Sequence, residues 1–176
     1  MISRAVIVAV GITATGQREV LGIEVGDSED ETFWTAFLRR LRERGLRGVQ
    51  LVISDAHTGL KKAIARCCQR SSWQRCRVHF ARNLLAKVPK GSQDMVAAAL
   101  RSVFAQPEAQ AVEQQWDQVT TMLREKFPAA AALMEQAKED VLAFRAFPPE
   151  HWRKIWSTST PWSGSTSHRE VRLAAQ

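Results

Sequence analysis

The sequence lacks the features of an exported or membrane-spanning protein. Its first apolar run, residues 4–11, is too short to cross a bilayer, and charged residues follow soon after it. Cysteine is scarce: Cys67, Cys68 and Cys76 are odd in number and two are adjacent, which does not indicate a disulfide framework. We therefore expect a cytoplasmic protein with reduced thiols and no membrane partner.

Size and charge set broad limits on the function. The chain has 176 residues, 45% of them hydrophobic, which is enough to bury one sizeable core. Its formal net charge is +7, and lysine and arginine concentrate in residues 39–47 and 61–90. This excess is compatible with a polyanionic partner such as DNA, and equally with solvated helix faces. Charge alone therefore leaves the partner open.

The first part of the chain alternates strand and helix patterns. Residues 4–12 are continuously apolar and rich in β-branched side chains, which predicts a buried strand. Residues 18–25 alternate polar and apolar side chains and predict its hairpin partner. In that partner we expect Val20, Ile23 and Val25 to face the core.

A helix is predicted after this hairpin. Ser28 and Glu31 form a capping box, so the helix should begin near residue 29. Gly45 and Gly48 should end it. Its apolar stripe comprises Phe33, Phe37, Leu38 and Leu41.

A second strand-and-helix pair follows, and then the pattern changes. Residues 49–54 form an apolar run typical of a strand buried on both faces. A helix is predicted over residues 58–69 and a short strand over residues 73–77. Helical patterns then cover residues 80–87, 92–104, 107–126, 128–144 and 150–156. Pro107 and Pro128 suit the first turns of their helices.

Asp55 is the leading candidate for chemistry. It directly follows the buried run of residues 49–54, and ligands of open α/β sheets lie beyond the carboxyl ends of strands. A carboxylate there can bind Mg²⁺, and two such ions held by several carboxylates can stabilise an in-line phosphoryl displacement. One aspartate does not hold two metals. The alternative interpretation is that Asp55 caps the helix that begins near Thr58.

Cys76 and His79 form a pair with metal-ligand spacing. A structural zinc site needs four ligands, which Cys67, Cys68 or His57 would have to complete. No second properly spaced pair exists in the sequence. Packing and a local hydrogen bond between Cys76 and His79, at a strand-to-helix junction, are therefore the favoured interpretation.

Other polar and aromatic residues have weaker claims. His57 can contact a phosphate or a metal-bound water, but such a histidine is more often a surface residue. Glu24 and Asp27 are candidates for further carboxylates of the site. Asp27 is more simply explained as part of the turn before Ser28. The tryptophans that can stack on bases are Trp34, Trp73, Trp116, Trp152 and Trp156. Packing is favoured for Trp34, Trp116, Trp152 and Trp156.

Several segments together resemble the Mutator-type transposases of bacterial insertion sequences. The resemblance covers residues 3–158 and is specific, because its motifs follow one another in the family's order and spacing. It rests on residues 18–29, Phe33 with Trp34, residues 52–60, residues 74–80 and residues 155–158.

The resemblance implies an α/β fold and a nuclease-type function. The expected fold is an incomplete ribonuclease-H-like core interrupted by a large all-helical insertion. The family uses two aspartates and one glutamate to bind two Mg²⁺ ions for DNA cleavage and strand transfer at terminal repeats. Asp55 matches the second aspartate, and Cys76 and His79 match a signature that follows it. His57 and Arg77 are candidate neighbours with no assigned step.

The sequence departs from the family pattern at both ends. The family's first aspartate and its N-terminal DNA-binding region precede the position at which this chain starts. The family's glutamate belongs to a segment resembling Asn-Pro-Leu-Glu-Arg-Leu-Asn, where this chain has residues 159–166. Tryptophan is encoded only by TGG, so the codon of Trp162 ends in G. If the codon of Ser163 begins with AG, a shifted reading frame contains GAG at this point, which encodes glutamate. We hypothesise a frameshift near Ser159. Glu170 is a poor substitute for the family's catalytic glutamate, because it follows a stretch with the composition of a disordered segment.

These expectations define the predicted organisation. Residues 1–78 form the partial core, 79–147 the helical insertion, 148–158 a return helix and 159–176 a disordered, out-of-frame tail. The predicted function is that of an insertion-sequence transposase, with this chain an inactive fragment that binds Mg²⁺ weakly. The alternative is a catalytically dead module that binds DNA, forms homo-oligomers or pairs with an intact transposase.

Overall fold

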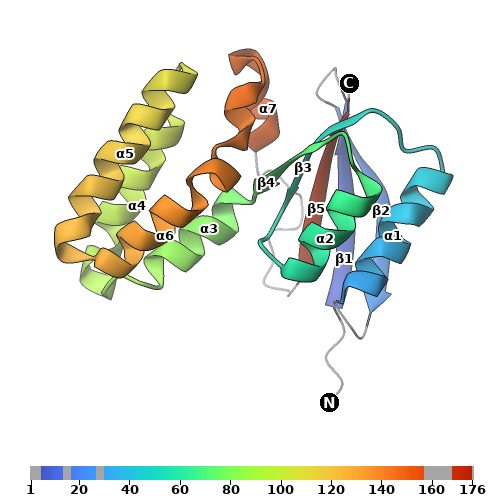
Figure 1. Cartoon of the computed structure of the whole chain (residues 1–176), viewed down its shortest axis with the longest axis horizontal. Coiled ribbons are helices and arrows are strands. Elements are labelled where there is room, and N and C mark those ends of the chain that lie inside the picture. The colour runs from blue at the N-terminus through green and yellow to red at the C-terminus, as the bar shows by residue number, and fades with distance from the viewer. Residues whose placement is uncertain (1–4, 14–16, 27–29, 157–167, 176) are drawn as a thin grey trace. The chain divides into compact units, whose positions relative to one another are not determined.

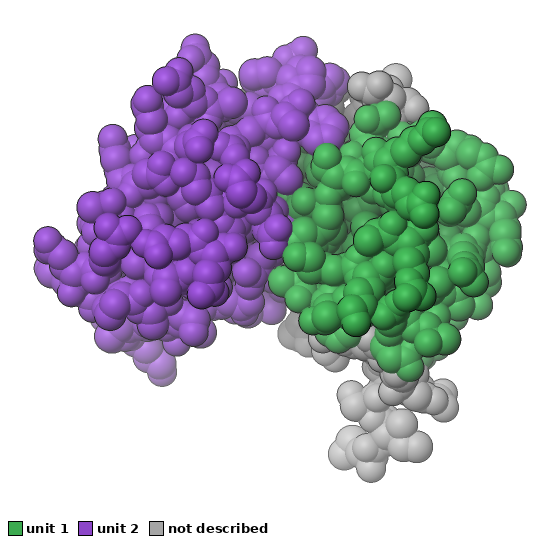
Figure 2. Space-filling model, viewed as in Figure 1, with its two compact units in different colours: residues 1–74, 154–176 green, residues 75–153 purple. Residues whose placement is uncertain are grey.

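A computed structural model describes residues 5–13, 17–26, 30–156 and 168–175 (Figure 1). The chain divides into two compact units, residues 1–74 with 154–176 and residues 75–153 (Figure 2). The second unit is therefore inserted in sequence between two segments of the first. In the described part of the chain, no helix has both the length and the apolar character needed to cross a bilayer.

The order of elements confirms the predicted mixture of an α/β part and a helical part. The strands are β1 (Ala5–Ile12), β2 (Arg18–Gly26), β3 (Val49–Ser54), β4 (Ser72–Arg75) and β5 (His168–Ala175). The helices are α1 (Glu31–Glu43), α2 (Thr58–Cys67), α3 (Arg77–Leu85), α4 (Lys90–Phe104), α5 (Ala109–Lys126), α6 (Pro128–Val141), the 3₁₀ turn η1 (Ala143–Ala146) and α7 (Pro149–Trp156).

The first unit is built on a mixed five-stranded sheet. Its described strands follow the order β2-β1-β5-β3-β4. β1 and β2 form the predicted antiparallel hairpin, whereas β5 runs parallel to β1 and antiparallel to β3. α1 and α2 lie side by side on one face of this sheet (Figure 1). Their apolar faces and the facing strand residues form one core, which includes Ile7, Trp34, Leu38, Val52 and Leu60.

The prediction for the inward face of β2 is wrong. Val20, Ile23 and Val25 are 62%, 65% and 56% exposed. Gly22 and Gly26 of β2 face α1, since a Cβ on Gly22 would lie 3.0 Å from Leu41 and one on Gly26 would lie 2.6 Å from Phe33. Successive strand residues point to opposite faces, so Ile23 faces away from the helices. The register shift of the hairpin then lets Val20 and Ile23 share the outer face, which a strict alternation does not predict.

The start of α1 also differs from the prediction. The helix begins at Glu31, and Asp30 is its N-cap: the Asp30 carboxylate accepts a 2.8 Å hydrogen bond from the amide of Phe33. Ser28, the predicted cap, lies outside the described residues. The predicted end is confirmed, because Gly45 and Gly48 both adopt positive φ (109° and 66°) between α1 and β3.

β5 occupies residues for which the sequence predicted disorder. It pairs with β1 from Val6, opposite His168, to Ile12, opposite Ala174. Its Leu173 is 1% exposed and belongs to the core. The predicted disordered tail is therefore wrong for residues 168–175. Residues 157–167, where the frameshift is hypothesised, lie outside the described residues, so that hypothesis stays a prediction.

The second unit is an all-helical bundle with its own core. Trp116 of α5 stacks on Phe80 of α3 with ring centroids 5.4 Å apart, and Phe144 meets Trp152 edge-on at 5.0 Å. Pro128 stands at the start of α6, as predicted. Pro107 instead precedes Glu108, the N-cap of α5, so it lies outside the first turn.

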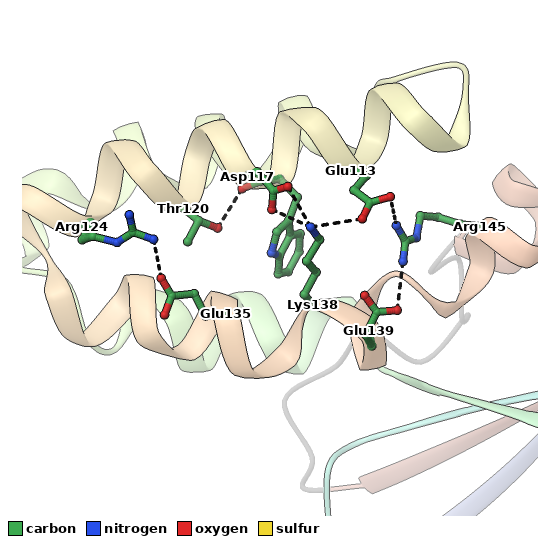
Figure 3. A network of polar contacts seen from close by, with 9 residues as sticks. Glu113, Asp117, Thr120, Arg124, Glu135, Lys138, Glu139 and Arg145 are labelled. Carbon is green, nitrogen blue, oxygen red and sulfur yellow. Dashed lines mark hydrogen bonds and ion pairs between the residues drawn. The ribbon is translucent and has the colours of Figure 1, made fainter.

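A polar network joins α5 to α6 and η1 (Figure 3). Lys138 contacts Asp117 at 2.7 Å and Glu113 at 3.3 Å, and Arg145 contacts Glu113 at 2.8 Å and Glu139 at 3.1 Å. Burial lowers the pKa of Lys138, but its hydrogen bonds to these carboxylates raise it, and the pKa lies above its ordinary value. These two basic side chains therefore connect α6 and η1 to the carboxylates of α5.

Candidate functional site

Asp55 lies where the sequence analysis expected it, directly after the last residue of β3. β3 has a neighbouring strand on each side, β5 and β4, so Asp55 follows an interior strand. The residue is half-buried. The N-cap of α2 is His57, two residues further on. Asp55 thus sits in the short connection between the carboxyl end of an interior strand and the start of a helix.

Hydrogen bonds hold the backbone at this point. The Trp73 indole N–H donates to the Ser54 hydroxyl at 2.9 Å, and that hydroxyl donates to the Asp55 carbonyl at 2.9 Å. Ser54 is fully buried, and the Nζ of Lys61 lies 3.9 Å from the centre of a Trp73 ring. The chain of contacts from Trp73 through Ser54 fixes the position from which the Asp55 side chain extends. This support was not predictable from the sequence, because no spacing rule connects two residues 19 positions apart.

His57 lies against the first turn of α2. It is half-buried, which differs from the surface position favoured for it, and its side chain makes no capping hydrogen bond. Its Nδ1 atom is buried and has no hydrogen-bond partner among the described residues. A Cβ on Gly59 would lie 3.3 Å from Cε1 of His57 and 3.0 Å from the backbone nitrogen of Glu31. Glycine at position 59 thus allows α1 to begin close to α2 and to His57.

Cys76 and His79 form a local pair at the junction of β4 and α3. Cys76 is the N-cap of α3, and its thiol is hydrogen-bonded to His79. Burial raises the pKa of the Cys76 thiol, but the hydrogen bonds and charge of His79 lower it, and the net pKa lies below its ordinary value. This is the local contact favoured over zinc. Among the residues that the structure describes, no group of three or more His, Cys, Asp or Glu side chains is placed to hold a metal ion.

The remaining candidates have structural contacts. Arg77 lies over the Phe104 ring, 5.5 Å from its centre, within the helical unit. Glu24 forms an ion pair with Arg40, and Asp27 lies outside the described residues. Asp55 and His57 belong to the first unit, whereas Cys76, Arg77 and His79 belong to the second.

Three of the tryptophans are buried and do not offer a face to a base. Trp34 and Trp116 are fully buried, and Trp152 is 3% exposed, with its indole N–H donating to the Phe147 carbonyl at 2.8 Å. The favoured packing interpretation is confirmed for these three. Trp73 is half-buried and engaged with Ser54 and Lys61.

The chain is similar to one protein family and to several transposases of known insertion sequences. The model of a family described as "Transposase, Mutator family" matches residues 1–161. The transposase for insertion sequence element IS1081 of Mycobacterium tuberculosis is 46% identical over 166 residues, which is 94% of this chain and 39% of that protein. The transposase of IS256 in transposon Tn4001 of Staphylococcus aureus is 43% identical over 104 residues, 59% of this chain and 27% of that protein.

A third relative extends the same result. The transposase for ISRM5 of Rhizobium meliloti is 36% identical over 162 residues, 90% of this chain and 40% of that protein. The chain thus spans about two fifths of the length of the IS1081 and ISRM5 transposases. β5 begins at His168, beyond the end of the family match at residue 161.

Proposed function

The chain belongs to the Mutator family of transposases, and from that premise we propose that it is part of a DNA transposase in which Asp55 is a metal-binding catalytic carboxylate. The reaction is Mg²⁺-dependent cleavage and strand transfer at the terminal repeats of an insertion sequence. The observation that carries this proposal is the position of Asp55 after the interior strand β3, with its backbone held through Ser54 and Trp73.

A ribonuclease-H-like core with a helical insertion is the fold that best accommodates this function. An antiparallel hairpin, a helix, the strand β3 and a second helix precede the helical unit, and the chain returns to the first unit at residue 154. Such a core presents carboxylates from different strands at one edge of its sheet. Asp55 is the member of that set which the described residues supply.

Mg²⁺ prefers oxygen ligands and keeps several waters, and the Asp55 carboxylate suits that chemistry. A two-metal site needs more carboxylates than one, and no cluster of three or more such ligands exists among the described residues. We propose that the missing ligands come from parts of a full-length transposase other than these 176 residues, which span 39% of the IS1081 transposase. The 176-residue polypeptide by itself should therefore bind Mg²⁺ weakly and leave terminal-repeat DNA uncut.

The same observation favours a second role for the polypeptide alone. With one candidate carboxylate and a formal charge of +7, it is suited to bind DNA, or to pair with an intact transposase, without performing chemistry. This role is compatible with membership of the transposase family, and it requires no further metal ligand.

A chimera tests the catalytic proposal. Residues 5–156 of this chain replace the aligned residues of the IS1081 transposase, and the product is incubated with IS1081 terminal-repeat DNA and Mg²⁺. We expect cleavage and strand transfer. The Asp55→Asn change should lower the rate on the order of 100-fold or more, because a neutral amide is a weaker ligand and stabilises less of the developing charge.

Asp94→Asn supplies the control, since Asp94 is exposed on α4 and its loss should change the rate less than about twofold. Circular dichroism and gel filtration establish that each chimera is folded. A folded chimera that does not cut, or an Asp55→Asn chimera that cuts as fast as its parent, would contradict the proposal.

A further inference from the structure

We propose that the pocket between the C-terminal ends of α1 and α2 binds phosphate groups of the DNA backbone through Arg42, Arg47 and Arg70. This inference rests on the proposed function for the identity of the polyanion. The pocket has a volume of about 450 Å³ and is lined by the ends of both helices and by the start of β3, all within the first unit. Neither the family match nor the names of the relatives assigns it a role.

The charge of the pocket is of one sign. Among the described residues that line it, three are arginines and none is acidic. Arg42 donates to the Cys67 carbonyl at 3.1 Å, and Arg47 donates to the Arg42 carbonyl at 3.2 Å. A guanidinium carries five N–H donors and stays charged, so these neutral acceptors use only part of its capacity. The pocket therefore keeps positive charge and free donors.

Several arginines outside the pocket are paired with carboxylates. Arg40 pairs with Glu24, Arg66 with Glu31 at 3.0 Å, and Arg124 with Glu135 at 2.6 Å. None of the three pocket arginines has a carboxylate partner among the described residues. The pocket arginines therefore carry charge that no described carboxylate neutralises.

The negative ends of the two helix dipoles explain only part of this arrangement. Arg42 lies in the last turn of α1, where a cation is favourable. Arg47 and Arg70 lie beyond the ends of α1 and α2, where the dipole effect falls off. Three guanidinium groups around one hollow suit phosphate oxygens, which a guanidinium binds through two parallel N–H bonds.

The pocket is separate from the metal site. It includes Val49, the first residue of β3, whereas Asp55 follows the last. At a rise of about 3.3 Å per residue, the length of β3 places the two sites roughly 15–20 Å apart. A phosphate contact at this distance would fix the position and direction of a duplex without reading its sequence.

A charge-matched comparison tests the proposal on the full chain. One variant carries Arg42→Gln, Arg47→Gln and Arg70→Gln, and the control carries Arg40→Gln, Arg66→Gln and Arg124→Gln. Fluorescence anisotropy measures the affinity of each for a 20-base-pair duplex of mixed sequence at several salt concentrations. Both triple variants lose the same charge, so a general effect of net charge acts on them equally.

The pocket variant should bind at least tenfold more weakly than the parent, and the slope of log affinity against log salt should fall by about 2–3, because each lost phosphate contact removes about 0.9. For the control variant, the slope should fall by less than about half of that amount. Arg70→Gln alone, outside any helix, should lower the slope by about 1 and serves if the triple variant unfolds.

Equal losses in the two triple variants would overturn the proposal, and so would a parent chain that does not bind the duplex. Neither result bears on cleavage by the chimera, which tests the proposed function independently. An Asp94→Asn chain, altered at an exposed residue of α4, should bind the duplex like the parent. A drop in affinity as large as that of the pocket variant would contradict the assignment of DNA binding to the pocket.

Discussion

Replacing Leu173 with aspartate is expected to destabilise the first unit by more than about 4 kcal/mol. Leu173 is 1% exposed and belongs to the core formed with Ile7 and Val52. The change removes a buried aliphatic side chain and places a carboxylate among apolar groups without a partner. Because β5 lies between β1 and β3, loss of its packing also leaves the facing edges of both strands unpaired.

Hydrogen exchange of the β1 and β3 amides is the suitable measurement, because it reports on the sheet separately from the helical unit. Protection of these amides should be lost in Leu173→Asp. The matched control is Ile23→Asp in β2, where the side chain is 65% exposed and the cost should stay below about 1 kcal/mol. Unchanged protection in Leu173→Asp would show that residues 168–175 do not contribute a strand to the sheet.

Trp116→Ala is the second change with a large expected effect, about 3–5 kcal/mol on the helical unit. Trp116 is fully buried and stacked on Phe80, so its removal leaves a cavity between α5 and α3. Its indole N–H has no hydrogen-bond partner among the described residues. Trp116→Phe should cost less, because it keeps the aromatic packing and removes that unpaired donor.

Thermal unfolding followed by the helical circular dichroism signal measures the effect. A loss of 3 kcal/mol corresponds to a midpoint lower by on the order of 12 °C or more in a unit of this size. Met122→Ala, on the same helix but 47% exposed, should change the midpoint little. A midpoint for Trp116→Ala equal to that of Met122→Ala would contradict the buried, stacked position of Trp116.

Elements with a strong local signal were predicted well from sequence. β3 spans residues 49–54 as predicted, because a continuous apolar run bounded by glycine and aspartate has few other solutions. α1 buries Phe37, Leu38 and Leu41 of its predicted stripe. Local periodicity was sufficient in both cases, since the buried face follows from spacing along a single element.

Features that depend on distant parts of the chain were not predictable in this way. The outer face of β2 follows from the hairpin register and from the close approach of α1 at Gly22, neither of which the alternation of β2 contains. β5 was missed because its stability comes from pairing with β1 and β3. The N-cap Asp30 was missed because Ser28 offered a better sequence signature.

The candidate site divides along the same line. The position of Asp55 after an interior strand was predictable from the apolar run before it, and its metal-binding role stays a prediction. The local pairing of Cys76 and His79 was also predictable, since they are three residues apart at a helix start. The contacts from Trp73 and Ser54 depend on the neighbouring strand β4, and the arginine pocket depends on two helices that end side by side.

The most direct test of the central claim, that Asp55 is a metal-binding carboxylate, is paramagnetic broadening of the amide signals of the ¹⁵N-labelled chain by Mn²⁺, which shares the preference of Mg²⁺ for oxygen ligands. At low Mn²⁺, the signals of Asp55, Ala56 and His57 should broaden first. Asp55→Asn should abolish this local broadening, and Asp94→Asn should preserve it. Broadening centred elsewhere, or unchanged around position 55 in Asp55→Asn, would contradict the claim.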